Sequence, residues 1–224
     1  AVTKKPCHIF NIRKNRPKTG LAPQHLLGIQ ALSRLCNGKL EGDFLGSEEI
    51  KFYPGEIDTT IPSVNVKIET AGSITLALQT LILPTLFAAS PVKIVFDGGA
   101  TDTFFSPTID YFRYCFLKIL GAKIEINVLK RGYYPEGGAK VEVNVFPSKL
   151  NNFNLTERGP LKKIMAISGA SEFLKNKKVA ERQLAGTREV LGKLKLPIEE
   201  KIEYYPTQCP GSQICLVADF KHTT

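Results

Sequence analysis

Apolar and polar positions alternate along the chain in blocks that predict an α/β protein. Apolar residues at intervals of three and four indicate helices over residues 23–36, 74–88, 107–120 and 179–194. Shorter alternating or apolar runs predict strands over residues 7–12, 39–44, 49–53, 57–70, 92–96, 123–129, 139–146, 163–168, 202–205 and 213–219. Pro84 predicts a kink or a break in the second helix near residue 83. The run Asp97-Gly98-Gly99 predicts a turn after the strand that precedes it.

Two parts of the chain follow the same order of elements: a helix, a turn with glycine, a strand, a loop and a second strand. The first covers residues 23–53 and the second covers residues 107–146. Chance could produce two such units, but a duplicated α/β module explains them better and predicts sheets with helices on one face. The polar run 148–154 predicts a boundary. Beyond it, a β-α-β-β order predicts a small second domain, or part of one.

The composition is that of a globular protein, with 224 residues, 43% hydrophobic and 23% charged. Lysine and arginine outnumber aspartate and glutamate by 30 to 21, and the net charge of +9 favours polyanionic partners such as nucleic acid. The alternative is a basic surface without such a partner. The longest apolar run is broken by Gln79, Thr80 and Pro84, and the first ten residues lack the order of a signal peptide. We therefore expect no membrane association.

The five cysteines are odd in number and none are spaced as CxxC, which argues against a disulfide framework and against a zinc site of the usual spacing. Cys36 and Cys115 lie on apolar helix faces, where a buried thiol is expected. A pairing of Cys209 with Cys215 is the alternative to free thiols. The cysteine pattern favours a reducing, cytoplasmic compartment.

Basic residues gather just before the first predicted helix, at Arg13, Lys14, Arg16 and Lys18. The first turn of that helix adds Gln24 and His25. Backbone N–H groups at a helix start attract anions, and guanidinium groups match the geometry of phosphate oxygens. The pattern predicts a phosphate-binding loop, and a solvated surface loop is the alternative.

Two further places are candidates for chemistry. Small residues at 71–73 would let a ligand approach the second helix, where Gln79 is either exposed or held by a specific partner. Asp97, Asp102 and Asp110 could bind Mg²⁺ or orient a base, but caps and turns explain them equally well. Neither GxGxxG nor GxxxxGK[ST] occurs, and the histidines support no Ser-His-Asp set. The residues alone do not determine a reaction.

Four segments, in their order and separation, resemble those of RNA 3′-terminal phosphate cyclases: IRKNRPKTGLAPQHL, ETAGSITLALQTLILP, GGATDTFFSPTIDYF and KRGYYPEGGAKVEV. The resemblance covers nearly the whole chain. The chain resembles the true cyclase branch more closely than it resembles the related nucleolar cyclase-like proteins. It implies repeated α/β units with a smaller α/β domain inserted late. The cyclase core is then expected over residues 1–150, with a second repeat at about 57–150, and the inserted domain over residues 155–224.

The resemblance also implies an activity. Enzymes of this family convert an RNA 3′-phosphate to a 2′,3′-cyclic phosphate with ATP and Mg²⁺ or Mn²⁺, through a covalent histidine–AMP and an RNA adenylate. By position, the residues expected to bind the RNA phosphate are Arg13, Arg16, Lys18, Gln24 and His25. Gln79 and Pro107 are expected to contact ATP, and no metal ligand is assigned. The expected partners are RNA 3′ ends and ATP, and a homodimer is one candidate oligomeric state.

The sequence also departs from the family pattern. We expect the family's N-terminal EGGGQ segment and the first part of the first repeat to lie outside this chain, together with the last repeat that carries the nucleophilic histidine. None of His8, His25 and His222 matches that histidine, so this chain alone is not expected to form an AMP adduct. The alternative function is a non-catalytic RNA-binding or ribosome-assembly protein of the same fold. A metabolic enzyme for small phosphorylated substrates has only the basic loop in its support.

Overall fold

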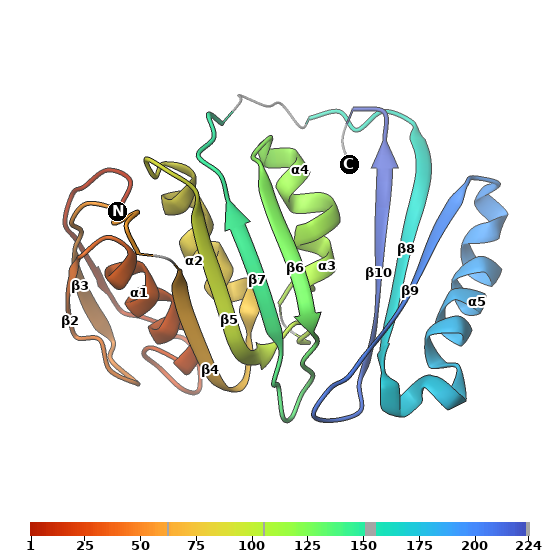
Figure 1. Cartoon of the computed structure of the whole chain (residues 1–224), viewed down its shortest axis with the longest axis horizontal. Helices are drawn as coiled ribbons and strands as arrows, with labels where there is room; N and C mark the ends of the chain where they lie inside the picture. The colour runs from red at the N-terminus through yellow and green to blue at the C-terminus, as the bar shows by residue number, and fades with distance from the viewer. Residues whose placement is uncertain (62, 105, 151–155, 223–224) are drawn as a thin grey trace.

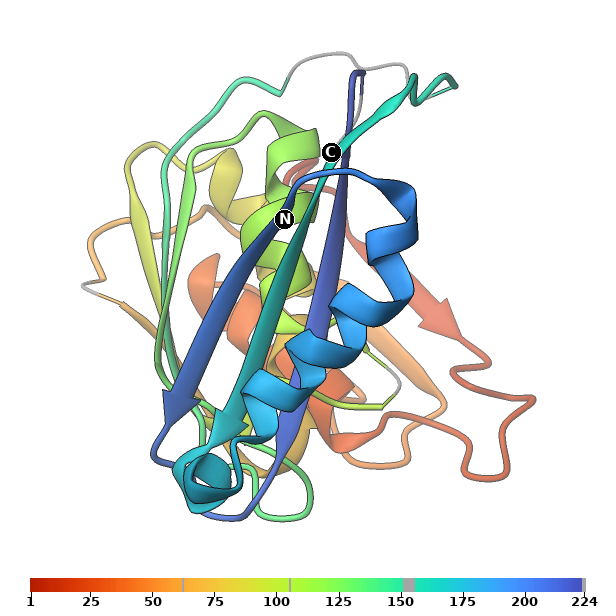
Figure 2. The same ribbon diagram turned by 90° about the vertical axis from the view of Figure 1, so that its right-hand side faces the viewer.

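The computed structural model describes residues 1–61, 63–104, 106–150 and 156–222. Its strands form three sheets, with helices between and beside them (Figures 1 and 2). The predicted α/β class is confirmed. Residues 151–155 of the predicted boundary lie outside the described residues, and the division into domains remains a prediction. Within the described residues, no helix is both long enough and apolar enough to cross a membrane.

The N-terminal sheet is antiparallel and has the strand order β1-β3-β2. Its strands are β1 (Cys7–Phe10), β2 (Lys39–Glu41) and β3 (Glu49–Tyr53). Ile50 and Phe52 of β3 are buried while their neighbours in the strand are exposed, as the period of two requires. Helix α1 (Pro23–Leu35) lies between β1 and β2 in the chain and begins at a proline, whose fixed φ suits the first helical position.

The central sheet has the order β4-β5-β7-β6 and carries the main hydrophobic core. Its strands are β4 (Val64–Ser73), β5 (Val92–Ala100), β6 (Ile124–Lys130) and β7 (Lys140–Val145). Helix α2 (Ile74–Leu86) joins the parallel pair β4 and β5, and all other pairs are antiparallel. The order β5-β7-β6 repeats the order β1-β3-β2, with a helical segment after the first strand each time. The duplicated module is therefore visible in the topology.

A helical segment lies between the central sheet and the third sheet (Figure 1). It consists of α3 (Ile109–Tyr111), a π-helical turn (Phe112–Phe116) and α4 (Leu117–Leu120). Phe112 belongs to the core of the central sheet, while Tyr114 and Cys115 pack against the buried cluster of the third sheet. One segment thus connects both cores.

The third sheet has the order β10-β8-β9, with β8 and β9 parallel. Its strands are β8 (Leu161–Ser171), β9 (Ile198–Tyr205) and β10 (Ser212–Phe220). Helix α5 (Val179–Leu191) stands between two 3₁₀ turns, Glu172–Lys177 and Gly192–Leu194, and runs beside this sheet (Figure 2). The predicted β-α-β-β order is confirmed.

Two local predictions are wrong. The turn predicted at residues 97–99 lies inside β5, because Gly98 still pairs with Ile68 of β4 and its φ of 88° lets the strand continue with an irregular register. Helix α2 runs past Pro84 without a break and ends at Leu86. Cys209 and Cys215 are free thiols, so they do not pair.

Candidate functional site

A cavity of about 650 Å³ lies where β4 and β5 end. Its wall comes from four segments of the chain and consists of Gln24, Thr70, Ala71, Gly72, Ser73, Thr103, Phe104, Ser106, Tyr134 and Pro135. Each of the four segments that resemble the cyclases contributes at least one of these residues. Ligand sites often form beyond the carboxyl ends of strands, where loops from separate parts of the chain meet.

Glycine allows the tip of the β6–β7 connection to reach the ends of β4 and β5. A Cβ added at Gly137 would lie 2.9 Å from the carbonyl oxygen of Gly99 and 3.0 Å from that of Thr70. The φ of 71° at Gly137 is also one that other residues rarely adopt. The tip therefore packs backbone against backbone and places Tyr134 and Pro135 on the cavity wall.

The basic loop before α1 is held in a defined shape. Arg13 donates from Nη1 to the carbonyl oxygen of Gly20 at 3.1 Å, and the backbone N–H of Gly20 donates to Ile12 at 2.8 Å. These bonds close the loop at its base. Arg16 and Lys18 lie within it and are exposed. A loop therefore occupies this stretch, with Arg13 supporting its backbone and Lys14, Arg16 and Lys18 facing solvent.

The start of α1 places Gln24 and His25 side by side in the first turn. Gln24 lines the cavity, while His25 is half-buried and does not line it. The backbone N–H of Ala22 donates to Nδ1 of His25 at 3.4 Å. Burial, and secondly the charge of Arg13, lowers the pKa of His25 below its usual value. A neutral imidazole that accepts at Nδ1 carries its proton on Nε2, where it can donate to a ligand.

The start of α2 forms another part of the wall. Ser73 caps this helix by accepting from the N–H of Leu76 at 3.2 Å, so the N-terminal end of α2 adjoins the cavity. Thr75 donates to the carbonyl oxygen of Pro107 at 2.8 Å, which fixes Pro107 beside this helix start. Gln79 is exposed and does not line the cavity. It lies six residues beyond the cap, or about 9 Å along the helix axis.

A buried cluster of charges stands behind the cavity wall, and the sequence patterns did not predict it. Arg131 has no exposed surface, and its guanidinium contacts Asp102 at 3.0 Å, Asp110 at 2.8 Å and Glu203 at 2.8 Å. Its guanidinium carbon lies 5.2 Å from the centre of the Tyr205 ring. Glu203 stands 72 positions from Arg131 in the chain, so no local spacing could have indicated the pair.

Asp102 connects this cluster to the cavity wall. Burial raises the pKa of its carboxyl, and the nearby charge of Arg131 opposes that shift. Its Oδ2 also accepts from the hydroxyl of Thr101 at 2.7 Å. Oδ1 of Asp102 and the hydroxyl of Thr103 are buried without a hydrogen-bond partner among the described residues. The backbone that carries Thr103 and Phe104 into the cavity wall is therefore anchored directly at Asp102.

The three aspartates grouped by sequence do not meet at one point. Asp102 and Asp110 share Arg131, whereas Asp97 is exposed and lines a different hollow together with Lys67 and Lys140. Among the described residues, no three side chains of His, Cys, Asp and Glu gather as a group that could hold a metal ion. Asp97 therefore shares no site with Asp102 and Asp110 among the described residues.

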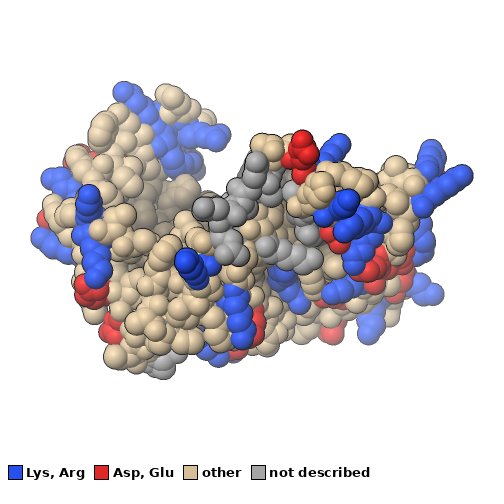
Figure 3. All heavy atoms as spheres, turned by 90° about the horizontal axis from the view of Figure 1, so that it is seen from above, with Lys and Arg blue, Asp and Glu red and all other residues tan. Residues whose placement is uncertain are grey.

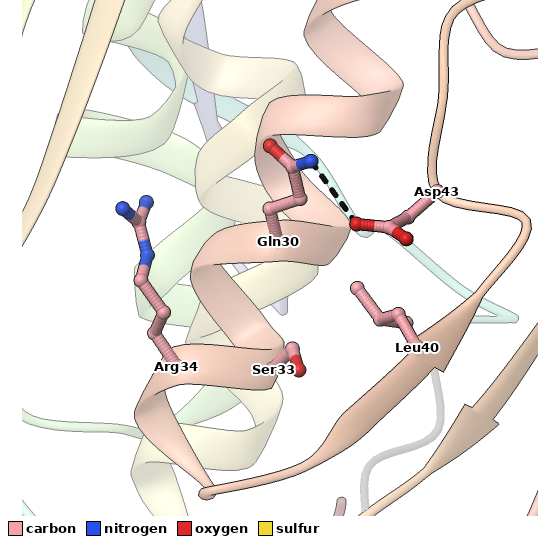
Figure 4. A pocket seen from close by; sticks show the side chains of 5 residues that line it. All are labelled: Gln30, Ser33, Arg34, Leu40 and Asp43. Atoms are coloured by element: carbon pink, nitrogen blue, oxygen red, sulfur yellow. Dashed lines mark hydrogen bonds between the residues drawn. The ribbon is translucent and has the colours of Figure 1, made fainter.

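A smaller hollow of about 300 Å³ lies between α1 and β2. It is lined by Gln30, Ser33, Arg34, Leu40 and Asp43, and Figure 4 shows the amide of Gln30 donating to Asp43, at 3.2 Å, while Arg34 points to the other side of the helix. On the face seen in Figure 3, lysine and arginine side chains lie in several separate groups rather than in one patch. None of the residues that line this smaller hollow belongs to the four segments that meet at the larger cavity.

Comparison with known proteins gives one consistent result. A family model described as RNA 3′-terminal phosphate cyclase matches residues 1–216. A protein named RNA 3′-terminal phosphate cyclase from Sulfurisphaera tokodaii is 41% identical over 100% of this chain and 66% of its own length. Proteins of the same name from Saccharolobus islandicus and Caldivirga maquilingensis are 41% and 40% identical over 97% of this chain, and over 64% and 63% of their own lengths. The chain thus spans slightly less than two thirds of these relatives.

Proposed function

The chain belongs to the RNA 3′-terminal phosphate cyclase family, and on that premise we propose that its large cavity receives the phosphorylated 3′ end of an RNA strand. The observation that carries the proposal is the convergence of four distant segments on this one cavity. The protein would then convert the 3′-phosphate to a 2′,3′-cyclic phosphate at the expense of ATP, as an ATP-dependent ligase.

The proposed reaction has three steps, and each has its own leaving group. A histidine attacks the α-phosphorus of ATP and pyrophosphate leaves. The RNA 3′-phosphate then takes AMP from that histidine. Finally the neighbouring 2′-hydroxyl loses its proton, attacks the terminal phosphorus and expels AMP. We assign the nucleophilic histidine to no residue of this chain, because His8 and His222 do not line the cavity and His25 is tied to the start of α1.

The local electrostatics support a phosphate at this place. Two helices of 13 residues, α1 and α2, begin at the cavity wall, and helix N-termini favour negative charge. The exposed cations of the adjoining loop, Arg16 and Lys18, can neutralise phosphate oxygens. Gln24 on the wall and Nε2 of His25 would add neutral donors. Arg13 would act mainly by holding the loop in shape.

ATP would enter beside the RNA end. The carbonyl oxygen of Pro107 accepts from Thr75 in the first turn of α2, which holds Pro107 beside that helix. Pro107 is exposed, so a nucleotide could lie against it. Gln79 is exposed farther along the same helix, where it would contact a part of the nucleotide that extends beyond the cavity. Mg²⁺ or Mn²⁺ would accompany ATP. The described side chains form no metal-binding group, so we assign no metal ligand in this chain.

Binding of short RNAs that differ only at the 3′ end tests the proposal. The 224-residue chain should bind an RNA with a 3′-phosphate more tightly than the same RNA with a 3′-hydroxyl, and Arg16→Ala should reduce that preference. Arg182→Ala, an exposed arginine on α5, is the matched control and should leave it unchanged. Equal affinity for both RNAs in the unmodified chain would contradict the proposal and favour a non-catalytic RNA-binding protein.

The compartment follows from the chemistry of the cysteines. The thiols of Cys7, Cys36, Cys209 and Cys215 are free and the last three are buried, which is typical of a protein kept in a reducing environment. We therefore propose that the protein acts in the cytoplasm, where its RNA substrate and ATP are both available.

A further inference from the structure

Two exposed aromatic side chains stand at the mouth of the cavity, and we propose that this aromatic pair, Phe104 and Tyr134, stacks on the terminal bases of the RNA strand. The inference rests on the proposed function and extends it, because it names the part of the RNA that is recognised besides the phosphate. The pair would hold the last nucleotides so that the 3′-phosphate meets the helix starts of α1 and α2.

The exposure of these two rings needs an explanation. Phe104 is 94% exposed and Tyr134 is 80% exposed, the largest fractions among the exposed large hydrophobic residues of the described chain. Both nevertheless line the same cavity of about 650 Å³. Large aromatic surface that stays in water at a cavity mouth is a common mark of a binding surface.

Each ring is carried by a short turn that is closed by backbone pairing. Thr103, directly before Phe104, pairs with Ser106, and Tyr133, directly before Tyr134, pairs with Gly137. Each backbone bridge restrains the main chain from which the neighbouring aromatic side chain projects. An aromatic side chain has only two χ angles to restrict, so stacking on such a ring costs little conformational entropy.

The two turns are also tied to each other. The backbone N–H of Thr101 donates to the carbonyl oxygen of Gly132 at 3.0 Å. Arg131 and Asp102, each directly beside one of these residues, form a buried ion pair at 3.0 Å. These two connections at the base of the turns fix the position of one ring relative to the other. Stacking of successive bases on both rings requires such a fixed arrangement.

The chemistry around the rings favours a nucleic acid over an apolar protein surface. None of the described residues that line the cavity is acidic, and their polar side chains carry hydroxyls and amides, such as those of Ser73, Ser106 and Gln24. Residues 11–24, which lead into α1, contain two arginines and two lysines but no aspartate or glutamate. Stacked aromatics beside a positively charged track are the usual way to bind single-stranded nucleic acid without sequence preference.

A fluorescent base at the RNA end tests the pair directly. The probe is an oligoribonucleotide with a 3′-phosphate and 2-aminopurine as its last base, whose fluorescence falls when it stacks. Binding to the unmodified 224-residue chain should quench this fluorescence. Phe104→Ala and Tyr134→Ala should each weaken binding roughly tenfold and reduce the quenching, as the loss of one stacking partner predicts.

The matched control is Phe173→Ala, which removes another exposed phenylalanine, 63% exposed and outside the cavity wall, and should change neither affinity nor quenching. A second measurement uses the unmodified chain and an RNA whose terminal nucleotide lacks a base. Its affinity should fall by a similar factor, independently of any effect of substitution on folding.

The results distinguish this inference from the proposed function. If the 3′-phosphate preference is present but Phe104→Ala, Tyr134→Ala and the abasic RNA all bind as tightly as the reference, the aromatic pair is not a stacking platform. If the preference itself is absent, the proposed function fails. Tight, quenched binding of the 3′-hydroxyl RNA that still depends on both rings would then support a base-binding surface alone.

Discussion

Single residues at the cavity are restricted by their backbone and by their neighbours. Gly98 has a φ of 88°, and a Cβ at this position would collide with the carbonyl oxygen of Ile68 on the adjacent strand. His25 has its Nδ1 engaged by the N–H of Ala22 and its charge opposed by Arg13. In both cases the immediate surroundings, rather than the residue type, determine what the residue contributes.

Substitution of Gly98 by alanine should destabilise the fold. The change forces a left-handed conformation on a residue with a Cβ and pushes that Cβ against backbone, at a combined cost of roughly 2 to 4 kcal/mol. Urea unfolding measures the effect. Gly186→Ala on α5 is the control, because that position is open and helical, and it should gain about 0.5 to 1 kcal/mol. Equal stabilities of the two variants would contradict the assigned strain.

His25 should titrate below pH 6.5 in the folded chain, because burial and Arg13 both disfavour its charged form. The unfolded state then binds the proton more tightly, so this residue's contribution to stability is full above pH 6.5 and is lost as the pH falls through the folded pKa. NMR titration of the imidazole measures the value, and Arg13→Ala should raise it. An imidazole pKa of 6.5 or more in the free chain would rule out this environment.

At the scale of elements, one buried arginine connects three segments that are distant in the chain. Arg131 follows β6, while its partners Asp110 and Glu203 lie at the start of the α3 segment and on β9. Thr103 of the cavity wall is attached to the same cluster through its neighbour Asp102. The central and third sheets are therefore joined by charge as well as by the apolar contacts of Tyr114 and Cys115.

Replacing Arg131 by methionine should cost about 3 to 5 kcal/mol, because it removes the cation that contacts the buried carboxylate of Asp102 and leaves the buried Asp110 with Arg113 alone, at 3.4 Å. Chemical denaturation measures the loss. The control is Arg188→Met, which breaks a pair with Glu200 in which the arginine is 55% exposed, and which should cost no more than about 1 kcal/mol. A cost for Arg131→Met as small as that of the control would show that the cluster does not hold the sheets together.

For the whole molecule, the net charge of +9 attracts a polyanion such as RNA. The position of the basic loop determines where on the surface the RNA is bound. If the exposed cations Lys14, Arg16 and Lys18 each neutralise one phosphate, changing all three to glutamine should reduce the slope of log affinity against log salt by about 2. Filter binding with a single-stranded RNA at several salt concentrations measures the slope.

The control for this experiment removes the same number of charges from the third sheet and its helices. It changes three exposed lysines that do not line the cavity: Lys162, Lys177 and Lys193. The slope should then fall much less. An equal fall in both triple variants would mean that RNA contacts the whole basic surface, and the loop would have no special role.

The elements themselves were largely predictable from the sequence, because each depends on neighbours in the chain. Helix α1 was expected to begin at Pro23 and does so, and β3 was predicted with the bounds Glu49–Tyr53 that it has. The errors arose where a local signal has two meanings. Gly98 and Gly99 take left-handed φ values in a turn and in an irregular strand alike, and only the pairing of β5 with β4 decides between them.

The cavity was only partly predictable for the same reason. The sequence by itself determined the basic loop, the helix start with Gln24 and His25, and the family to which the four segments point. Only the tertiary structure decided that these segments share one cavity wall, that Gln79 stays outside it, and that Arg131 holds Glu203 from 72 positions away. Hydrophobic periodicity reports which face of an element is buried, but contacts between distant side chains exist only once the sheets have packed.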